Sequence, residues 1–243
     1  MLKSHSSAAL PRSGFSGPWY YARRASEFLE DAANPRHFRH MLADAHRQRW
    51  GVKPADGEVI SWERSSEVLR TLLENAACTK DQMVVLEYCL QNAGRIDAML
   101  CGFDRQARLN AVLLELKRWQ KCMMEESSES RSVRVDFGSG VEERLHPSVQ
   151  VLRYRDRLQE LLAPRERKGA KRVRLSPYAY LHNCSPISAN IANMRRVLLD
   201  RKFRDYLHPA PLFMGGNAET LERKIGRRIG RGKGDEVLRR LVR

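Results

Sequence analysis

Three apolar runs in the middle of the sequence constrain its fold more than any other feature. They span residues 83–90, 95–103 and 109–116, and each has the length of a β-strand. The polar breaks between them, of about four to six residues, are typical of turns between antiparallel neighbours. Both faces of the third run are apolar apart from Glu115 and Lys117, as expected for a central strand covered by helices. We therefore predict an antiparallel meander inside an α/β domain.

Charged residues inside these runs mark a candidate site. Side chains two apart in a strand share a face, so Glu115 and Lys117 point the same way. If the second break turns at Gln106, Asp97 lies opposite Glu115, because 106 is midway between them. A charge inside an apolar strand is costly unless it is paired or bound to a metal. The pattern predicts two carboxylates and an ammonium on one patch of sheet.

The same arithmetic extends the patch by one strand. Asn92 is midway between Glu87 and Asp97, so three carboxylates would lie across neighbouring strands, about 4.7–4.9 Å apart per step. Such a row is repulsive without a cation, and hard oxygen ligands suit Mg²⁺ or Mn²⁺. A one-residue slip in either turn would separate the carboxylates. The alternative is a strand-end ion pair of Glu115 and Lys117, with Asp97 in a turn.

A helix is predicted after the meander, from His146-Pro147-Ser148 to about Leu162, with Ser148 as its N-cap. Gln150 and Tyr154 are four residues apart and share one face of this helix. An amide beside a phenol can hydrogen-bond the outer shell of a metal site or a DNA phosphate. The alternative is a half-buried helix face.

The remaining elements complete an α/β pattern. Helix-like spacing covers residues 19–49 with a break at Asn34-Pro35, and a third helix opens at Ser61. Residues 123–144 are polar and predict a flexible loop with a short strand at 133–137. We expect a strand at 177–182, a helix at 191–200, an extended piece at 210–213, and a helix from 218 with a glycine-rich break. His146 and His182 are assigned packing or capping roles, and Tyr178 and Tyr180 belong to the core.

The formal net charge of +15 and a pI near 10.1 indicate a polyanionic partner, most commonly nucleic acid. Two basic stretches, 165–174 and 223–243, are placed to straddle a duplex and neutralise phosphates. The alternatives are a solvated basic surface without a dedicated ligand and, for the second stretch, a flexible tail.

Other function classes are disfavoured. No apolar run approaches the roughly 18–20 residues of a membrane span. The five cysteines are scattered and form no CxxC pair, which indicates neither a zinc site nor a disulfide framework and favours a reducing cytoplasm. Residues 1–15 are basic, rich in serine and free of acids. This composition is shared by transit peptides, but an untethered tail is the interpretation we favour.

Together these residues resemble the PD-(D/E)XK nuclease superfamily, in its RecB-like form. Over about residues 60–240 the chain resembles the N-terminal nuclease-like module of a bacterial family that carries a C-terminal ATP-dependent helicase. The resemblance implies metal ligands at Asp97 and Glu115, a catalytic lysine at Lys117, and supporting residues at Gln150 and Tyr154; Glu87 is added from strand geometry alone. The resembling segments are Leu86–Tyr88, Arg95–Asp97, Leu114–Trp119, His146–Tyr154, Tyr178–Asn183 and Ala210–Phe213.

The resemblance implies a restriction-endonuclease-like fold, a central mixed sheet flanked by helices, preceded by a helical N-terminal region. The expected organisation is a flexible basic tail (1–18), the helical region (19–58), the nuclease core (59–215) and a basic C-terminal helical tail (216–243). The chain contains no GxxxxGK[ST] motif, so any helicase or ATPase is expected to be a separate partner.

We therefore predict a cytoplasmic, Mg²⁺- or Mn²⁺-dependent nuclease that hydrolyses DNA, in preference to RNA, and acts in restriction or anti-phage defence. The competing prediction is a non-catalytic nucleic-acid-binding or scaffold subunit of a defence or repair complex. The oligomeric state is left open, a homo-oligomer included.

Overall fold

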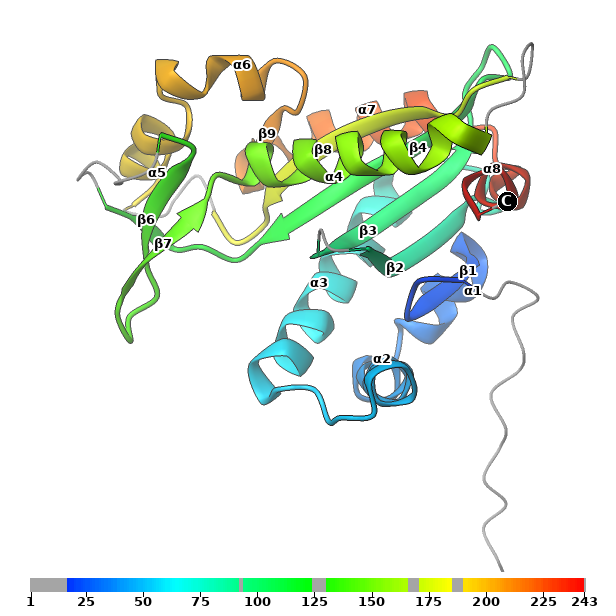
Figure 1. The fold of residues 1–243 in the computed structure, drawn as a ribbon, viewed down its shortest axis with the longest axis horizontal. Helices are drawn as coiled ribbons and strands as arrows, with labels where there is room; N and C mark the ends of the chain where they lie inside the picture. Colours follow the sequence, from blue (N-terminus) through cyan, green and yellow to red (C-terminus); the bar gives the residue numbers. More distant parts are fainter. Residues whose placement is uncertain (1–16, 92–93, 124–129, 166–170, 185–189, 243) are drawn as a thin grey trace, which may run out of the picture.

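The computed structural model describes residues 17–91, 94–123, 130–165, 171–184 and 190–242. They form a mixed six-stranded sheet in the order β1-β2-β3-β4-β8-β9 with helices against both faces, and a separate three-stranded sheet in the order β5-β6-β7 (Figure 1). The strands are β1 (Tyr21–Arg24), β2 (Met83–Leu90), β3 (Gly94–Phe103), β4 (Leu109–Lys117), β5 (Lys121–Cys122), β6 (Ser132–Asp136), β7 (Val141–Leu145), β8 (Arg174–Leu181) and β9 (Leu212–Met214).

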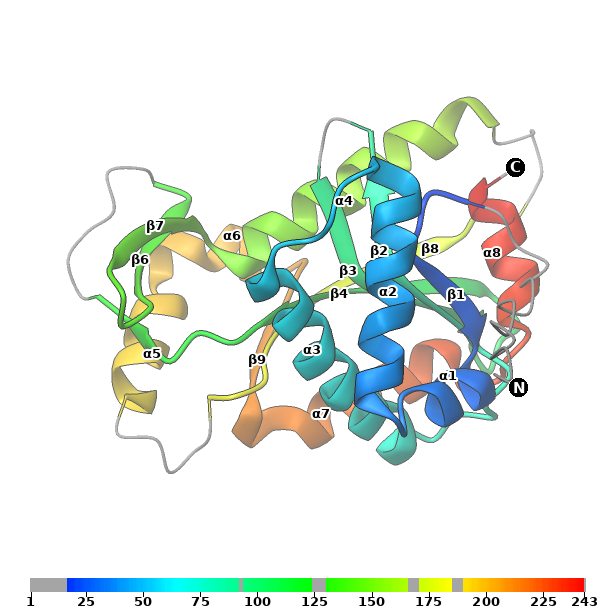
Figure 2. The same ribbon diagram turned by 90° about the horizontal axis from the view of Figure 1, so that it is seen from below.

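The helices form two layers around the main sheet. Those before β2, together with α7, pack on one face, and α4 and α8 pack on the other. The small α5 and α6 lie beside the three-stranded sheet, at the opposite end of the molecule from α8 in both views (Figures 1 and 2). The helices are α1 (Ala25–Asp31), α2 (Pro35–Trp50), α3 (Asp56–Asn75), α4 (Pro147–Leu162), α5 (Ile191–Leu198), α6 (Arg204–Leu207), α7 (Ala218–Ile229) and α8 (Gly234–Val242).

The predicted meander is confirmed, together with its register. Strands β2, β3 and β4 are consecutive antiparallel neighbours, with Leu86 opposite Ala98 and Ala98 opposite Leu114. One residue further along the same register, Asp97 falls opposite both Glu87 and Glu115. Strand β4 then pairs in parallel with β8, which places it inside the sheet. The long apolar runs fix this register because a slip of one residue would exchange the faces of every side chain.

Strand β2 changes face at Glu87. Residues two apart in a strand normally share a face. Here Leu86 packs in the core under α3 and α7, whereas Tyr88 packs in the core under α4. The backbone explains the exchange, because Glu87 has a φ of 53° in the left-handed region. A non-glycine residue there costs about 1–3 kcal/mol, and such positions cluster at functional sites.

The N-terminal region is not wholly helical as predicted. Tyr21–Arg24 form strand β1, which pairs with β2 and completes the edge of the main sheet. The spacing of Tyr21 and Ala25 suits a helix as well as a strand followed by a helix, so tertiary pairing decides the outcome. Asn34 caps α2 by accepting a hydrogen bond from the His37 amide, as the predicted break requires.

Helix α3 begins earlier than predicted, at Asp56 rather than at Ser61. Asp56 and Glu58 in its first turn favour a start there, because carboxylates stabilise the positive end of the helix dipole. Gly57 between them weakens the helical signal of the sequence, which accounts for the later start that the sequence predicts.

The polar segment 123–144 contains more structure than predicted in its described part, residues 123 and 130–144. Strand β6 confirms the short strand expected near Val133, but β7 was not expected. Its sequence, Val-Glu-Glu-Arg-Leu, has no apolar alternation, and it is a strand because it pairs along its length with β6. A turn with Gly138 at a φ of 82° joins the two strands.

The predicted helix after the meander is confirmed as α4, but its cap is His146 and not Ser148. The His146 Nδ1 accepts a hydrogen bond of 3.1 Å from the Ser148 amide, and Nε2 lies 2.9 Å from the Leu198 carbonyl oxygen, to which it donates. The ring stacks on Phe203 with centroids 4.2 Å apart. Burial lowers the pKa of His146 to about 4, so it caps the helix as a neutral imidazole.

The C-terminal segment is part of the core, which corrects its interpretation as a basic tail. Helix α7 buries Leu221, Ile225 and Ile229 against the sheet, and α8 buries Val237 and Leu238. The predicted N-terminal tail falls almost wholly outside the described residues, as does the middle of the basic loop at 165–174. Within the described ranges, none of the helices has both the length and the apolar character that crossing a bilayer requires.

We predict that Gly234→Ala destabilises the fold, because α8 is docked at backbone distance on the sheet. A Cβ atom at Gly234 would lie 2.0 Å from the Met83 nitrogen and 2.5 Å from the Cys101 oxygen. The free energy of unfolding should fall by about 1–3 kcal/mol or more. Gly57→Ala in α3 is the matched control, because its Cβ meets nothing within 4 Å. It should stabilise by up to about 1 kcal/mol. Urea denaturation of both variants checks this; equal stabilities would contradict it.

Candidate active site

The predicted site residues meet where the main sheet opens between its two helical layers. Glu115 and Lys117 end β4, and Asp97 lies beside them near the start of β3. A cavity of about 460 Å³ extends from Asp97 between α3 and α4, and a second of about 490 Å³ extends toward the β6–β7 hairpin. Asp97 and Ser61 line both cavities. The site lies at the carboxyl end of β4 in the parallel β4–β8 pair, the usual ligand position in such sheets.

Glu115 is the most deeply buried of the predicted residues, with 0% of its surface exposed. Its Oε1 lies 2.5 Å from the Lys117 Nζ. Its Oε2 has no hydrogen-bond partner among the described residues. Burial, with the nearby Asp97, raises the pKa of Glu115 to about 8. Burial opposes the charge on Lys117 as well, but the two carboxylates outweigh it and raise its pKa to about 12.

Asp97 links the two strands. Its Oδ2 accepts a hydrogen bond of 2.8 Å from the backbone amide of Leu116, the residue after Glu115. Burial raises the pKa of Asp97, and Lys117 and the Leu116 amide oppose the rise. Half-buried Asp97 and buried Glu115 thus form a pair of neighbouring carboxylates, with the Lys117 ammonium paired to Glu115. Such a pair titrates as a unit rather than as two independent acids.

Glu87 is close to the pair but is held by a different cation. Its Oε2 lies 3.0 Å from the Arg95 Nε. Burial raises the pKa of Glu87 to about 8, Asp97 adds to the rise, and Arg95 opposes it. The repulsion predicted for three neighbouring carboxylates is therefore relieved by Arg95 on one side and Lys117 on the other.

Arg95 has a role that the sequence did not predict. Its guanidinium contacts the Glu87 and Glu58 carboxylates and donates a hydrogen bond of 2.6 Å to the Tyr20 hydroxyl. The ring of Tyr20 lies beneath it, with the guanidinium carbon 5.3 Å from the centroid. Arg95 thereby ties β3 to α3, β2 and the segment before β1. Its position two residues from Asp97 was the available signal, but Glu58 and Tyr20 are far from it in the sequence and lie outside the predicted strands.

Gln150 and Tyr154 face this site from α4, as predicted. The Gln150 Nε2 donates a hydrogen bond of 2.8 Å to the Tyr154 hydroxyl. Burial raises the pKa of Tyr154 to about 12, and the neighbouring Glu115 adds to the rise. Gly94, with a φ of 89°, permits this approach, because a Cβ there would lie 3.2 Å from the hydroxyl.

The donor set fits a divalent cation in part. Two hard oxygen ligands suited to Mg²⁺ or Mn²⁺ are present. They are the Glu115 Oε2, which has no hydrogen-bond partner among the described residues, and the Asp97 carboxylate, which lines both cavities. Over the described ranges, no group of three or more His, Cys, Asp and Glu residues is arranged to hold an ion. Glu87 in particular is engaged with Arg95. The geometry supports two protein ligands, with the remaining positions left to water or substrate oxygen.

The cavity toward the β6–β7 hairpin adds aromatic and basic surface that the sequence did not assign. Trp119 follows β4 and lies with its ring centroid 5.9 Å from the Lys117 Nζ. Phe137, at the hairpin turn, is 43% exposed and lies beneath the Arg144 guanidinium. An exposed aromatic ring and arginines at the rim of a carboxylate site are groups on which nucleic-acid bases and phosphates dock.

Comparisons of this chain with protein-family models, with curated proteins and with solved structures found no match. The assignment of the site therefore depends on its residues and their geometry.

We predict that stability decreases with pH between 6.5 and 8 in the absence of divalent metal. The pKa of Glu115 in the folded state, about 8, exceeds its ordinary value of 4.5. The folded chain therefore keeps a proton that the unfolded chain loses, and the free energy of unfolding falls as the pH rises toward 8. His146, with a lowered pKa of about 4, is neutral in both states over most of this range and does not mask the effect.

Glu115→Gln should reduce this slope by up to about 1.4 kcal/mol per pH unit, because an amide does not titrate. Glu87, whose pKa burial also raises to about 8, retains its own share of the slope. Urea unfolding followed by tryptophan fluorescence in EDTA at several pH values measures the slope. The exposed Glu160→Gln on α4 is the control and should retain the wild-type slope. Parallel curves for wild type and Glu115→Gln would contradict the buried-carboxylate interpretation.

Proposed function

We propose that this protein is a metal-dependent nuclease that hydrolyses phosphodiesters of DNA. The observation that carries the proposal is the set formed by buried Glu115, half-buried Asp97 and Lys117. Asp97 lines two cavities, and the Glu115 Oε2 lacks a hydrogen-bond partner among the described residues. The antiparallel β2-β3-β4 meander, followed by α4 and the parallel strand β8, suits the restriction-endonuclease-like fold that the resemblance implies.

Lys117 would act through its charge and not as a base. With a pKa near 12 it keeps its proton at neutral pH, so it cannot accept one from water. A fixed ammonium beside the carboxylates stabilises negative charge that develops on a phosphate in the transition state. Its pairing with Glu115 holds it in position before substrate binds.

Tyr154 and Gln150 would position the substrate. The Tyr154 hydroxyl accepts the Gln150 hydrogen bond and keeps its own proton, because its pKa is near 12. It can therefore donate to a phosphate oxygen. Gln150 fixes the orientation of the phenol, and Arg95 fixes the strand that carries Asp97.

Asp97 and Glu115 would hold the metal, Mg²⁺ or Mn²⁺. When bound, such an ion polarises the scissile phosphate and lowers the pKa of a coordinated water. Its charge would also offset the burial that raises the pKa of both carboxylates. A role in restriction or anti-phage defence, with a separate helicase or ATPase, is proposed from the resemblance.

A binding subunit without catalytic activity is the second candidate. It is favoured by the ion pairs that occupy Lys117 and Glu87, and by the lack of a three-donor metal group among the described residues. The net charge of +15 suits both candidates. A cleavage assay distinguishes the nuclease from the binding subunit, because only the nuclease needs the Asp97 and Lys117 side chains for its activity.

We predict that the protein nicks supercoiled plasmid DNA in Mg²⁺ or Mn²⁺, and that Asp97→Asn and Lys117→Met each reduce the rate by about 10²-fold or more. Asn and Met keep the approximate size of each side chain and remove its charge. Agarose gel electrophoresis over time gives the rate. Exposed Glu160→Gln and half-buried Lys224→Met, both away from the site, are the matched controls and should cleave as the wild type does.

Each other outcome has a defined meaning. Equal cleavage by wild type, Asp97→Asn and Lys117→Met would contradict the assignment of these residues to the active site. Binding of DNA by the wild type without cleavage in either metal would support the binding subunit. Degradation of RNA with DNA untouched would retain the site and change the substrate.

Tyr154→Phe tests the positioning role by removing one hydroxyl. We expect cleavage to fall by about 10-fold, less than for Lys117→Met, because only one hydrogen bond to substrate is lost. Gln150→Ala should have a similar effect in the same assay, and combining the two should add little because they act through one hydroxyl. Fully additive losses would contradict the shared role.

A further inference from the structure

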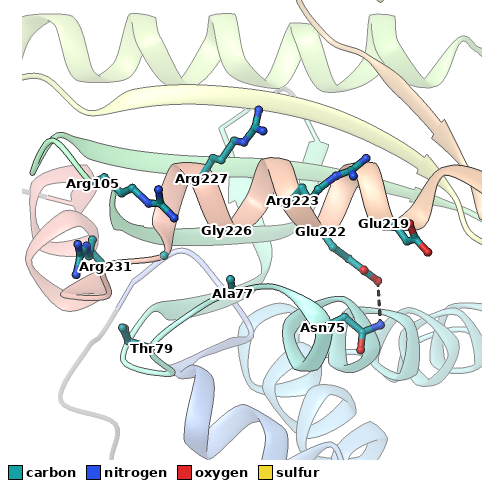
Figure 3. Close-up of a pocket in the computed structure, with 11 residues that line it drawn as sticks. Asn75, Ala77, Thr79, Arg105, Glu219, Glu222, Arg223, Gly226, Arg227 and Arg231 are labelled. Carbon is teal, nitrogen blue, oxygen red and sulfur yellow. Dashed lines mark hydrogen bonds between the residues drawn. The ribbon is translucent and has the colours of Figure 1, made fainter.

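A third cavity lies away from the candidate active site, and four arginines are among its lining residues. It is a groove of about 660 Å³ between α7 and the residues that follow α3 (Figure 3). None of its lining residues belongs to the two cavities at Asp97. Arg105, in the β3–β4 turn, closes one end, and it is eight residues beyond Asp97. Along a strand this separation is about 26 Å.

The positive charge comes from two segments far apart in the sequence. Arg223, Arg227 and Arg231 are spaced four residues apart at one side of α7 and just after it, and Arg105 approaches from the turn. Figure 3 shows Arg105 and Arg231 at the same end of the groove. The row from Arg223 to Arg231 extends about 12 Å along the helix axis.

These arginines lack the partners that neighbouring arginines have. Arg108, in the same turn as Arg105, pairs with Asp104 at 2.6 Å. Arg223 donates only to the Thr220 hydroxyl, at 3.0 Å. Among the described residues, the guanidinium groups of Arg105, Arg227 and Arg231 form no ion pair and no hydrogen bond; Arg231 bonds only through its backbone amide, to the Phe103 carbonyl oxygen at 2.9 Å. The four arginines that line the groove outnumber its two carboxylates, Glu219 and Glu222, so the lining is net positive and an anion bound among the arginines is stabilised.

The groove is held rigidly by backbone contacts. Gly226 and Gly230 allow α7 to approach the chain after α3, because a Cβ at Gly230 would lie 2.8 Å from the Ala77 oxygen. The Asn75 side chain donates a hydrogen bond of 3.0 Å to Glu222, and Gln82 donates one of 2.9 Å to the Ile229 carbonyl. Glu222 is thereby turned toward Asn75, which leaves the end near Arg105 and Arg231 basic. A preorganised cationic groove binds anions with little loss of entropy.

We propose that this groove binds the phosphate backbone of a nucleic-acid strand at a distance from the cleavage site. A row of about 12 Å matches several phosphates at 3.4 Å of helix axis per nucleotide. A single phosphate would need side chains that converge on one point. The choice of nucleic acid as the ligand rests on the proposed function. The groove would add affinity and fix the direction in which the substrate leaves the active site.

The test is binding of a fluorescein-labelled duplex, measured by anisotropy in EDTA over a range of NaCl concentrations. The triple variant Arg105→Gln, Arg227→Gln and Arg231→Gln is compared with a control triple of equal charge, Lys224→Gln, Arg228→Gln and Arg240→Gln, whose residues do not line the groove. Each lost phosphate contact reduces the slope of log Kobs against log salt by about 0.9. The groove triple should therefore lose about 2–3 units of slope and bind about 10-fold or more weakly at low salt. The control triple, whose residues lie outside the groove, should lose less slope and less affinity than the groove triple.

If the two triples reduce the salt slope and the affinity for the duplex equally, the proposal that the groove binds nucleic acid is overturned, because the loss of net charge alone would then explain the reduced affinity. Binding of fluorescent ATP that the groove triple loses and the control triple keeps, with duplex binding equal in both triples, would assign the groove to free nucleotides and overturn the nucleic-acid assignment. Circular dichroism checks folding, and if the groove triple is misfolded, Arg105→Gln and Arg231→Gln alone should each lose about 0.9 units of slope.

The two proposals fail separately. Binding is read in EDTA, where no metal supports cleavage, and cleavage is read in Mg²⁺ or Mn²⁺. A wild type that binds through the groove but never cleaves would remove the nuclease assignment and keep the groove. If the wild type cleaves DNA and the groove triple binds the duplex as tightly as the wild type does, the nuclease assignment is kept and the groove proposal is removed. No binding of nucleic acid by the wild type would overturn both.

Discussion

The register of β2, β3 and β4 is the constraint on which the site depends. It sets Asp97 opposite both Glu87 and Glu115, and the Leu116 amide holds Asp97 to β4. A slip of one residue in either pairing would send a carboxylate into an apolar core. The apolar side chains of these strands therefore do more than fill the interior: by fixing the register, they determine which charges meet.

The charges that meet are stabilised locally and in two separate groups. Lys117 neutralises the Asp97 and Glu115 pair, while Arg95 neutralises Glu87 and Glu58 and is anchored by Tyr20. Because burial raises the pKa of Glu87, Asp97 and Glu115, the site favours one proton or one additional cation at neutral pH. The candidate chemistry and the predicted pH dependence follow from the same cause.

Much of this arrangement could be predicted from the sequence because it depends on long apolar runs and on turns of fixed length. Strands β2–β4, their register and helix α4 with Gln150 and Tyr154 belong to that class. What could not be predicted depends on contacts between distant segments. Strand β1 and strand β7 exist because a partner strand is beside them, and the role of Arg95 requires Glu58 and Tyr20 from elsewhere in the chain. The sequence pattern of each segment alone carries no sign of these partners.

The left-handed backbone at Glu87 has a consequence for where its side chain can be. In a regular strand a side chain belongs to one layer of the protein or to the other. Because β2 exchanges its faces at this residue, the Glu87 carboxylate is directed into neither core and lines the cavity between α3 and α4. Glycine would adopt this backbone without strain, so the glutamate is kept at a cost to stability. The sheet thus has an acidic group in the cavity between its two helical layers. The alternation of side chains between the two faces of a regular strand cannot place a group there.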